Sequence, residues 1–589
     1  PFLARQPAHC TTHDRIPQML NHLTRLQTLT QAMMERAALR PDQPAVIFIH
    51  DDGREETVTV AQFHARAAGY AQALQSIGVQ PEDLVVLVLK HSQTLLYAFW
   101  GAMYLGAIGS IFPFLTEKLD AQIYMERVRE LVMHSRAKAV ITFPEFKKQL
   151  SDLLKGVDCA VLCTEDVPEI SNAQTLQQMA WSMYDGEKIA FLQHSSGTTG
   201  LQKGVALSHR AVLNQIEAYQ QAIDLQPDDV IISWLPLYHD MGLIAGFVMP
   251  LVAGVPLVLM SPFKWVRDPK TLFHAIHRHR GTLCWLPNFA YNHCARVIRS
   301  CDIEDVDLSS MRAFINCSEP VFFESHQVFL EKFAAHGVRP EALSTCYAMA
   351  ENTFAVTQFP IGQMPTLDWV HTRTLQEQRR ALPAQPASAG STPMVSCGFP
   401  IPNTDICILD DNGLQLPERH IGEVALRSNC MLSGYYHRPD LTTQAMRDGW
   451  YYTGDMGYIA NGELYITGRK KDLIIHGGKN IYPQDLEAIA NTIPGITPGR
   501  SVAFGLMDKS LGSEKIVMIC ELDHHSLGKE EQHNIEMELR KRVVQRSEVA
   551  LADVRLVGKR WLIKTSSGKI ARAANREKYL REFLGEEQS

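Results

Sequence analysis

The chain has few of the features that mark secreted, metal-bound or nucleic-acid-coating proteins. Its twelve cysteines are scattered over 589 residues. Only Cys159 and Cys163 lie close together, and no CxxC pair or regular framework predicts a zinc site or a disulfide scaffold. A net charge of −7 argues against a protein that coats nucleic acid. The sequence therefore predicts a protein of a reducing cytoplasm with no nucleic-acid partner.

An export signal and an uninterrupted membrane span are also missing. Residues 1–9 contain no apolar run of signal-peptide length, although the chain does not begin with Met and an upstream segment could have been removed. The uncharged stretches 94–116 and 241–263 are long enough to cross a bilayer, but both contain glycine and proline. Pro250 and Pro256 divide the second into a short helix and a strand at 256–260. We expect no transmembrane span.

Alternating strand and helix patterns predict an α/β fold. A helix is expected at 60–77, between strands at 45–49 and 84–89. Four more strands are expected at 139–142, 160–163, 189–192 and 230–234. After residue 405 the expected strands are shorter and closer together, at 406–409, 422–427 and 463–467, which favours an antiparallel β unit. The fold class predicted is thus α/β, with layered α/β subdomains followed by a β-rich subdomain.

The length of the chain predicts more than one domain, because a single core rarely serves so many residues. A charged run at 468–472 marks a boundary. We expect a large N-terminal domain at 1–470, with its β-rich subdomain at about 396–468, and a small mobile α+β domain at 471–589. Residues 376–393 are rich in Ala, Pro, Gln and Ser and predict an exposed loop.

Residues 191–204 read as an apolar strand that runs into a hydroxyl- and glycine-rich loop. The loop can donate hydrogen bonds and allow close backbone approach to an anion, and Lys203 adds a positive charge. Ser208 can cap a helix that begins near His209. Glycine follows Lys203 where a Walker loop needs Ser or Thr, so the pattern disfavours a Walker-type site. The order of strand, loop and helix favours another class of nucleotide triphosphate site over a solvated loop. The phosphate-binding candidates are Ser195, Ser196, Gly197, Thr198, Thr199 and Gly200.

Four further groups carry candidate chemistry. His239 ends a strand-like segment and can gate or polarise a substrate, or simply form a structural hydrogen bond. Tyr347 and Glu351 lie four residues apart, where the ring can stack on a purine and the carboxylate can bind Mg²⁺. Asp455 lies in a short turn and can hold ribose hydroxyls or cap the turn. Lys569 lies in a hydroxyl-rich segment near the end of the chain, in an active-site turn or a flexible basic tail.

Taken in order, these five groups resemble the adenylate-forming superfamily, which includes acyl-CoA synthetases, luciferases and peptide-synthetase adenylation domains. The resemblance covers nearly the whole chain and implies ATP and Mg²⁺ as cofactors. It places Tyr347 at adenine, Asp455 and Arg469 at ribose, and Glu351 at the metal. It also implies ATP contacts from Asn316, Ser318, Glu319, Pro320, Ala348 and Met349.

The resemblance further implies that Lys569 is the catalytic lysine, assisted by Lys203 and His239. Lys471 matches the hinge position of the family, about which the small domain swings between the two half-reactions. Departures from the family pattern are Gln202 and Ile563 in place of prolines, and Cys317 and Ala348 in place of glycines.

Within the superfamily the chain looks most like fatty acyl-AMP ligases. The strings that carry this resemblance are WLPLYHDMGL at 234–243, PNFAY at 287–291, VSCG at 395–398 and YPQD at 482–485. It implies activation of a medium- to long-chain fatty acid to acyl-adenylate, followed by transfer to an acyl carrier protein that acts in trans. An insertion within about 352–395 is expected to restrain the small domain. Candidates for the acyl pocket are Trp234, Met241, Gly242, Phe289 and Tyr291.

Three other functions stay open at this point. A fatty acyl-CoA synthetase would share every nucleotide residue and use free coenzyme A. An amino-acid adenylation enzyme would need a carboxylate near the substrate amine, and Asp240 occupies roughly that region. A non-catalytic scaffold that binds acyl-adenylate is disfavoured by the presence of Lys203, Glu351 and Lys569.

Overall fold

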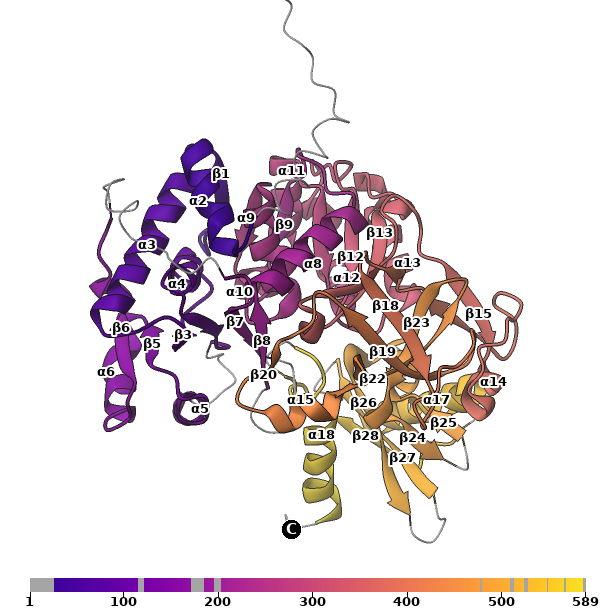
Figure 1. Cartoon of the computed structure of the whole chain (residues 1–589). Coiled ribbons are helices and arrows are strands. Elements are labelled where there is room, and N and C mark those ends of the chain that lie inside the picture. Colours follow the sequence, from indigo (N-terminus) through magenta and orange to yellow (C-terminus); the bar gives the residue numbers. More distant parts are fainter. Residues whose placement is uncertain are drawn as a thin grey trace, which may run out of the picture.

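The computed structural model describes residues 26–114, 121–170, 185–194, 203–476, 479–508, 513–523, 528–547, 549–565 and 568–585. It confirms the expected mixed α/β class. Two large sheets and their helices form the N-terminal part, and smaller β-rich units follow toward the C-terminus (Figure 1).

The first large sheet has nine strands in the order β17-β14-β13-β12-β11-β9-β10-β1-β2. Its six central neighbours, from β13 to β1, are all parallel. Parallel strands end at one edge, where ligands usually bind in sheets of this kind. The strands are β1 (Pro44–Ile49), β2 (Glu55–Thr59), β9 (Ile231–Ser233), β10 (Leu257–Met260), β11 (Leu283–Leu286), β12 (Ala313–Asn316), β13 (Leu343–Ala348), β14 (Ala355–Gln358) and β17 (Phe399–Pro400).

The second large sheet has seven strands in the order β20-β8-β7-β4-β3-β5-β6. β7 and β8 pair antiparallel, and the phosphate-binding candidates of the sequence lie in the connection between them. The strands expected from the sequence are found, with ends that differ by one or two residues. The sheet comprises β3 (Leu84–Val88), β4 (Ile108–Ile111), β5 (Ala139–Thr142), β6 (Ala160–Cys163), β7 (Ile189–His194), β8 (Gly204–Ser208) and β20 (Gly434–Tyr435).

Helices join the two sheets through a shared aromatic core. Phe99 packs against Phe191 of β7 at 5.3 Å between ring centroids and against Phe247 at 6.1 Å. Ser208 caps α8 as expected, since its Oγ accepts the Ala211 N–H at 3.1 Å. The helices of this part are α2 (Leu29–Leu39), α3 (Val60–Ser76), α4 (Gln93–Tyr104), α5 (Ala121–Ser135), α6 (Pro144–Leu153), α8 (His209–Ala222), α10 (Pro262–Arg267), α11 (Lys270–His279), α12 (Asn288–Val297) and α13 (Phe323–Phe333).

The two uncharged stretches fold as interior elements of these layers. The first contributes α4 and β4. The second is divided into a π-helical segment η2 (Met241–Val248), α9 (Met249–Ala253) and β10, as its prolines predict. Among the described residues, no helix combines the length and apolar character that crossing a membrane requires.

A five-stranded antiparallel unit follows, as expected, with β18, β19, β22 and β21 in order and β23 on β22. The segment before it forms the hairpin of β15 and β16, with α14 between them, and the expectation of an exposed loop at 376–393 is wrong for part of its length. Gln376 is only 4% exposed and Ala381 fully buried. The elements are β15 (Leu367–His371), α14 (Thr372–Gln378), β16 (Ser391–Val395), β18 (Thr404–Leu409), β19 (Gly422–Ser428), α15 (Pro439–Ala445), β21 (Met446–Arg447), β22 (Trp450–Ala460) and β23 (Glu463–Arg469).

The C-terminal segment has a core of its own around Leu486, Met518 and Leu539. It lies beside the β-rich unit in Figure 1. Tyr482 of this segment joins a buried apolar cluster with Tyr458 and Tyr465. The domain boundary at residue 471 and the extent of the insertion stay predictions. The elements are β24 (Ile474–His476), β25 (Lys479–Ile481), α16 (Pro483–Asn491), β26 (Ile496–Asp508), β27 (Ser513–Leu522), α17 (Lys529–Ser547), β28 (Asp553–Val557), α18 (Arg572–Tyr579) and η8 (Leu580–Leu584).

A buried histidine in α3 predicts a loss of stability in acid. Burial lowers the pKa of His64 to about 4, and its Nδ1 lies 2.6 Å from the Tyr104 hydroxyl. An unfolded histidine titrates near pH 6.5. Between these pH values His64 is protonated in the unfolded chain but stays neutral in the folded protein. The His64 contribution to stability is therefore lost as the pH falls from about 6.5 toward 4.

We expect the drop in melting temperature between pH 7 and pH 5 to be smaller in His64→Gln than in the wild type. His437→Gln, at an exposed position, serves as the control and should keep the wild-type dependence. An equal drop in melting temperature between pH 7 and pH 5 in all three proteins would contradict the role of His64 in acid sensitivity.

Candidate active site

The ends of β13 and β23 and the middle of β22 bring together the predicted adenine and ribose residues. The Tyr347 hydroxyl donates to Asp455 Oδ2 at 2.6 Å, and Arg469 Nε lies 3.1 Å from Asp455 Oδ1. Asp455 and Arg469 are direct partners in the pairing of β22 with β23. Burial and the Asp455 charge raise the pKa of Tyr347 well above its ordinary value, so the phenol stays a donor. These contacts hold a carboxylate and a guanidinium in fixed positions beside an aromatic ring.

A second cluster connects Glu351 with Lys203. The Tyr435 hydroxyl donates to Glu351 Oε1 at 2.8 Å and lies 2.9 Å from the Tyr451 hydroxyl. The Lys203 ammonium lies 4.9 Å from the centre of the Tyr435 ring. The sequence analysis missed Tyr435, because its role depends on the pairing of β20 with β8, which are far apart in the chain.

Lys203 is the only one of the phosphate-loop candidates within the described part of the chain. The predicted positions Ser195, Ser196, Gly197, Thr198, Thr199 and Gly200 lie outside the described residues. β7 ends just before them and β8 begins just after Lys203, so the strand, loop and helix order expected from the sequence is present around them.

Half-buried His239 and buried Asp240 form a pair just before η2. His239 Nδ1 lies 2.6 Å from Asp240 Oδ1, which also accepts the Met241 N–H at 2.8 Å. Burial alone would raise the pKa of Asp240, but His239 and Lys569 hold it below its ordinary value. The carboxylate is therefore charged, and His239 and Lys569 both act on it.

Lys569 reaches this site from the C-terminal segment. Burial lowers the pKa of Lys569, the carboxylates of Asp240 and Glu319 oppose that shift, and Arg469 adds to it. Charges on the residue before η2, on the segment after β12 and on the end of β23 thus act on this lysine. This arrangement brings a cation to the edge where the parallel strands end.

The segment after β12 is shaped by a buried network of polar side chains. Asn316 Nδ2 donates to Asn288 Oδ1 at 3.1 Å and to His326 Nε2 at 3.0 Å. Ser318 has a φ of 69°, a left-handed conformation that is uncommon outside glycine. Glu319 Oε2 accepts the Phe289 N–H at 3.0 Å. Pro320 follows directly, and Ala348 and Met349 follow Tyr347 at the end of β13.

The acyl-pocket candidates are divided between two environments. Tyr291 is fully buried, and its hydroxyl donates to the Phe314 carbonyl at 3.0 Å inside the core. Trp234 and Met241 are 3% and 2% exposed at the strand edge. A Cβ on Gly242 would lie 2.2 Å from the Pro236 carbonyl oxygen, so no side chain fits there.

Trp265 is an aromatic neighbour that the sequence analysis did not find. Its ring stacks on Trp234 with centroids 3.6 Å apart and an angle of 7°. Phe289 lies edge-on to both rings, at 6.3 Å from Trp234 and 6.1 Å from Trp265. Since the Phe289 N–H also binds Glu319, this apolar group lies directly beside the polar centre.

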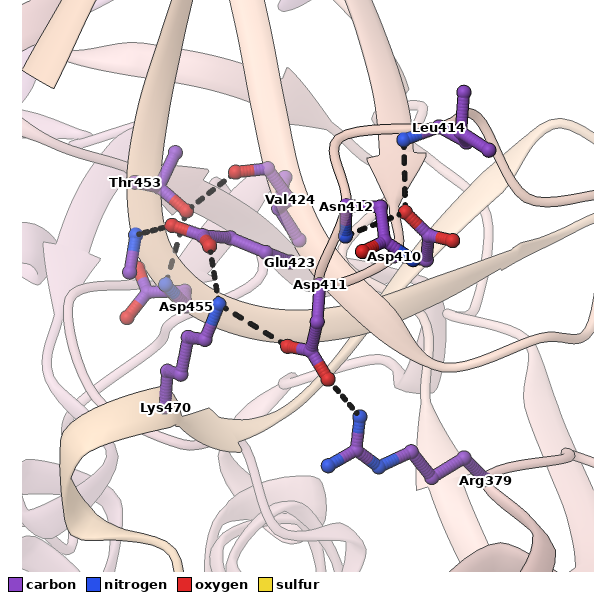
Figure 2. A network of polar contacts seen from close by, with 11 residues as sticks. Arg379, Asp410, Asp411, Asn412, Leu414, Glu423, Val424, Thr453, Asp455 and Lys470 are labelled. Carbon is purple, nitrogen blue, oxygen red and sulfur yellow. Dashed lines mark hydrogen bonds and ion pairs between the residues drawn. The ribbon is translucent and has the colours of Figure 1, made fainter.

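The hinge candidate Lys471 lies in a short turn, η7 (Lys470–Asp472), next to an ion-paired lysine. Lys470 Nζ lies 3.0 Å from Glu423 Oε2 and 3.3 Å from Asp411 Oδ1, and Asp411 binds Arg379 at 3.1 Å (Figure 2). Arg379 directly follows α14. The turn is therefore tied to the β-rich unit and, through Asp411, to the segment between β15 and β16.

The comparisons with known proteins cover most of the chain. The family model for AMP-binding enzymes matches residues 33–436. A putative acyl-CoA synthetase of Caulobacter vibrioides is 29% identical over 535 residues, 90% of this chain and 92% of its own. The medium-chain-fatty-acid–[acyl-carrier-protein] ligase JamA of Moorena producens is 27% identical over 576 residues, 94% of this chain and 95% of its own.

A solved structure gives the same result for the fold. It comes from structural and functional studies of fatty acyl-adenylate ligases from E. coli and L. pneumophila, with a TM-score of 0.85 and 27% sequence identity. The match covers 95% of this chain and 98% of the solved one.

Replacement of Asp455 should weaken the binding of ATP. In Asp455→Asn the negative charge is lost from the group that pairs with Arg469 and accepts the Tyr347 hydroxyl. Hydrogen bonds to charged groups contribute about 1.5–3 kcal/mol, so we expect the dissociation constant for ATP to rise about tenfold to hundredfold in calorimetry. Asp405→Asn, whose carboxylate is exposed and paired with Arg427 on β19, is the matched control. Equal ATP affinity in both variants would contradict a nucleotide role for Asp455.

Proposed function

We propose that this chain activates a medium- to long-chain fatty acid. It belongs to the family of AMP-binding enzymes and is an adenylate-forming ligase. The fatty acid and ATP would form acyl-adenylate and pyrophosphate, and the acyl group would then pass to the phosphopantetheine thiol of an acyl carrier protein in trans. The observation that carries this proposal is that the charges of Asp240, Glu319 and Arg469 act on Lys569.

In the first half-reaction a carboxylate oxygen of the fatty acid attacks the α-phosphorus of ATP. The new P–O bond forms as the bond to the β-phosphate breaks, and pyrophosphate leaves with the electron pair. Lys569 would neutralise the charge that builds up between the carboxylate and the α-phosphate, and Lys203 would face the leaving pyrophosphate. Asp455, Arg469 and Tyr347 would hold the nucleoside.

Glu351 is the candidate ligand for Mg²⁺. It offers an oxygen ligand of the kind that Mg²⁺ prefers, beside Lys203, and a bound Mg²⁺ would neutralise phosphate charge. The Tyr435 hydroxyl would keep one carboxylate oxygen of Glu351 in a fixed orientation.

In the second half-reaction the thiol sulfur of the carrier attacks the acyl carbon, loses its proton, and AMP leaves with the electron pair of the broken bond. We propose that rotation about Lys471 removes Lys569 from the site for this step and admits the carrier. The relative named as an acyl-carrier-protein ligase supports the carrier as acceptor.

An amino acid is a weaker candidate substrate than a fatty acid. The Asp240 carboxylate is buried and engaged with His239 and Lys569, so a substrate amine would have to displace a partner already in place. The aromatic group of Trp234, Trp265 and Phe289 supports an apolar substrate at the same edge. The relative named as a putative acyl-CoA synthetase keeps free coenzyme A as the alternative acceptor.

The products distinguish these possibilities. We expect purified protein given ATP, Mg²⁺ and dodecanoic acid to accumulate dodecanoyl-AMP with or without coenzyme A, as identified by mass spectrometry. Saturated acids of increasing length should show a preference for medium to long chains. Acyl-CoA in the tube with coenzyme A would make the protein an acyl-CoA synthetase, and a preference for acetate would exclude the fatty acid proposal.

Removal of the Lys569 amino group should abolish the first half-reaction selectively. We expect Lys569→Ala to form acyl-adenylate about 100- to 1,000-fold more slowly, because its charge acts mainly in the transition state, while ATP still binds. Lys559→Ala removes an exposed lysine of the same segment and should keep the wild-type rate. Unchanged adenylation by the purified Lys569 variant would refute the assignment.

A further inference from the structure

Two hydrogen bonds between Thr565 and Lys569 close the turn that carries Lys569. The Thr565 N–H donates to the Lys569 carbonyl at 2.7 Å, and the Lys569 N–H donates to Thr565 Oγ1 at 3.2 Å. Ile570 and Lys564 form an isolated bridge beside them. The two ends of the turn meet where the Ala571 N–H donates to the Ile563 carbonyl at 3.0 Å. The direction of the Lys569 side chain thus depends on how these ends are held.

Both ends are held by a side chain that no motif of the sequence singles out. Asn575, on α18, is fully buried. Its Oδ1 accepts the Ile563 N–H at 2.8 Å, and its Nδ2 donates to the Ile563 carbonyl at 2.8 Å and to the Ala571 carbonyl at 2.9 Å. The amide therefore pairs with both backbone polar groups of Ile563, as a residue on a neighbouring strand would. It also binds Ala571 at the other end of the turn.

The helix that carries Asn575 is itself anchored in the C-terminal segment. Arg572, three residues earlier, donates to Glu487 of α16 at 2.5 and 3.3 Å and lies 3.8 Å from Asp472, the residue after the hinge candidate. Asn575 therefore connects the turn to a fixed base. A positioning group on a rigid helix sets the direction of a catalytic side chain more closely than a loop alone.

We infer that Asn575 is a positioning residue for the adenylation half-reaction, which holds both ends of the turn so that Lys569 is directed at the reacting carboxylate and α-phosphate. This inference rests on the proposed function of Lys569. An apolar side chain at position 575 would remove the acceptor of the buried Ile563 N–H and one of the two donors to each carbonyl, and the turn would have to move to give that N–H a new partner. A shift of about 1 Å in a reacting group can cost about 100-fold in rate.

The test compares the two half-reactions in Asn575→Leu and Asn575→Asp. Leucine has a similar size and no polar atoms, whereas aspartate keeps the acceptor for the Ile563 N–H but places an oxygen against two carbonyl groups. We expect acyl-adenylate formation to fall about 100-fold in both. Acyl transfer from synthetic dodecanoyl-AMP to a phosphopantetheine thiol should stay within about threefold of the wild type, because Lys569 has left the site for that step. Any unfolded fraction lowers both rates equally, so their ratio isolates the position of the turn.

Ser547→Ala is the matched control for a lost buried hydrogen bond in the same segment. Ser547 is 3% exposed on α17, and its Oγ donates to the Val543 carbonyl at 2.6 Å, remote from the turn in the chain. This variant should lower the melting temperature and keep the wild-type ratio of the two rates. If the Asn575 variants also keep that ratio, Asn575 has a structural role only and the inference is overturned.

A second measurement needs no activity and separates failure of the inference from failure of the proposed function. Trypsin cleaves after Lys564 and Lys569, and we expect cleavage at these sites, followed by mass spectrometry, to be at least tenfold faster in Asn575→Leu than in the wild type or Ser547→Ala. Equal cleavage rates would overturn the anchoring of the turn. A wild-type protein that forms no acyl-adenylate, together with faster cleavage of the variant, would show that Asn575 holds the turn and that the proposed reaction is wrong.

Discussion

The electrostatic attraction between Lys569 and the carboxylates of Asp240 and Glu319 is the interaction on which the candidate site depends. A partly buried ammonium loses hydration, so it is held in place only because opposite charges replace the water it gives up. Asp240 is in turn charged because His239 and Lys569 face it. The C-terminal segment therefore meets the large α/β part through opposite charges, one set on each part. The candidate nucleotide residues include Arg469, whose charge also acts on Lys569.

The parallel sheet explains how residues from distant parts of the chain reach this point. The segments after β9, β11 and β12 leave the sheet at the same edge and carry Trp234, Phe289 and Ser318, and Tyr347 lies near the end of β13. The antiparallel pair of β22 and β23 brings Asp455 and Arg469 to the same side through the contact of Asp455 with Tyr347. The aromatic group lies beside Glu319, whose carboxylate accepts the Phe289 N–H and acts on Lys569. An amphiphilic substrate suits such a boundary.

Movement of the C-terminal segment would have to break contacts of two kinds. The ion pairs of Lys470 with Glu423 and Asp411 are partly exposed, and contacts of this kind contribute little and are screened by salt. The cluster of Tyr458, Tyr465 and Tyr482 is buried and joins the segment to the β-rich unit more strongly. Inside the segment, by contrast, Asn575 and Arg572 keep the Lys569 turn, α18 and α16 together. The segment is thus built to keep the Lys569 turn intact whether or not it leaves the candidate site.

Local patterns in the sequence predicted most of the fold, because strands, caps and breaks depend on neighbouring residues: the strand at 139–142, the Ser208 cap and the division of 241–263 at its prolines are examples. The motifs also named Tyr347, Glu351, Asp455 and Lys569 in advance. Composition was misleading at 376–393, where Ala381 is buried although the segment is rich in loop-forming residues. Tyr435, Trp265 and Asn575 carried no signal, since each acquires its role from a partner brought close by folding: Glu351 for Tyr435, Trp234 for Trp265 and Ile563 for Asn575. The sequence by itself determined which chemical groups are present and which local elements hold them. Only the tertiary structure decided which of these groups meet, because burial and hydrogen bonding act between atoms that are close in space, whatever their separation in the chain.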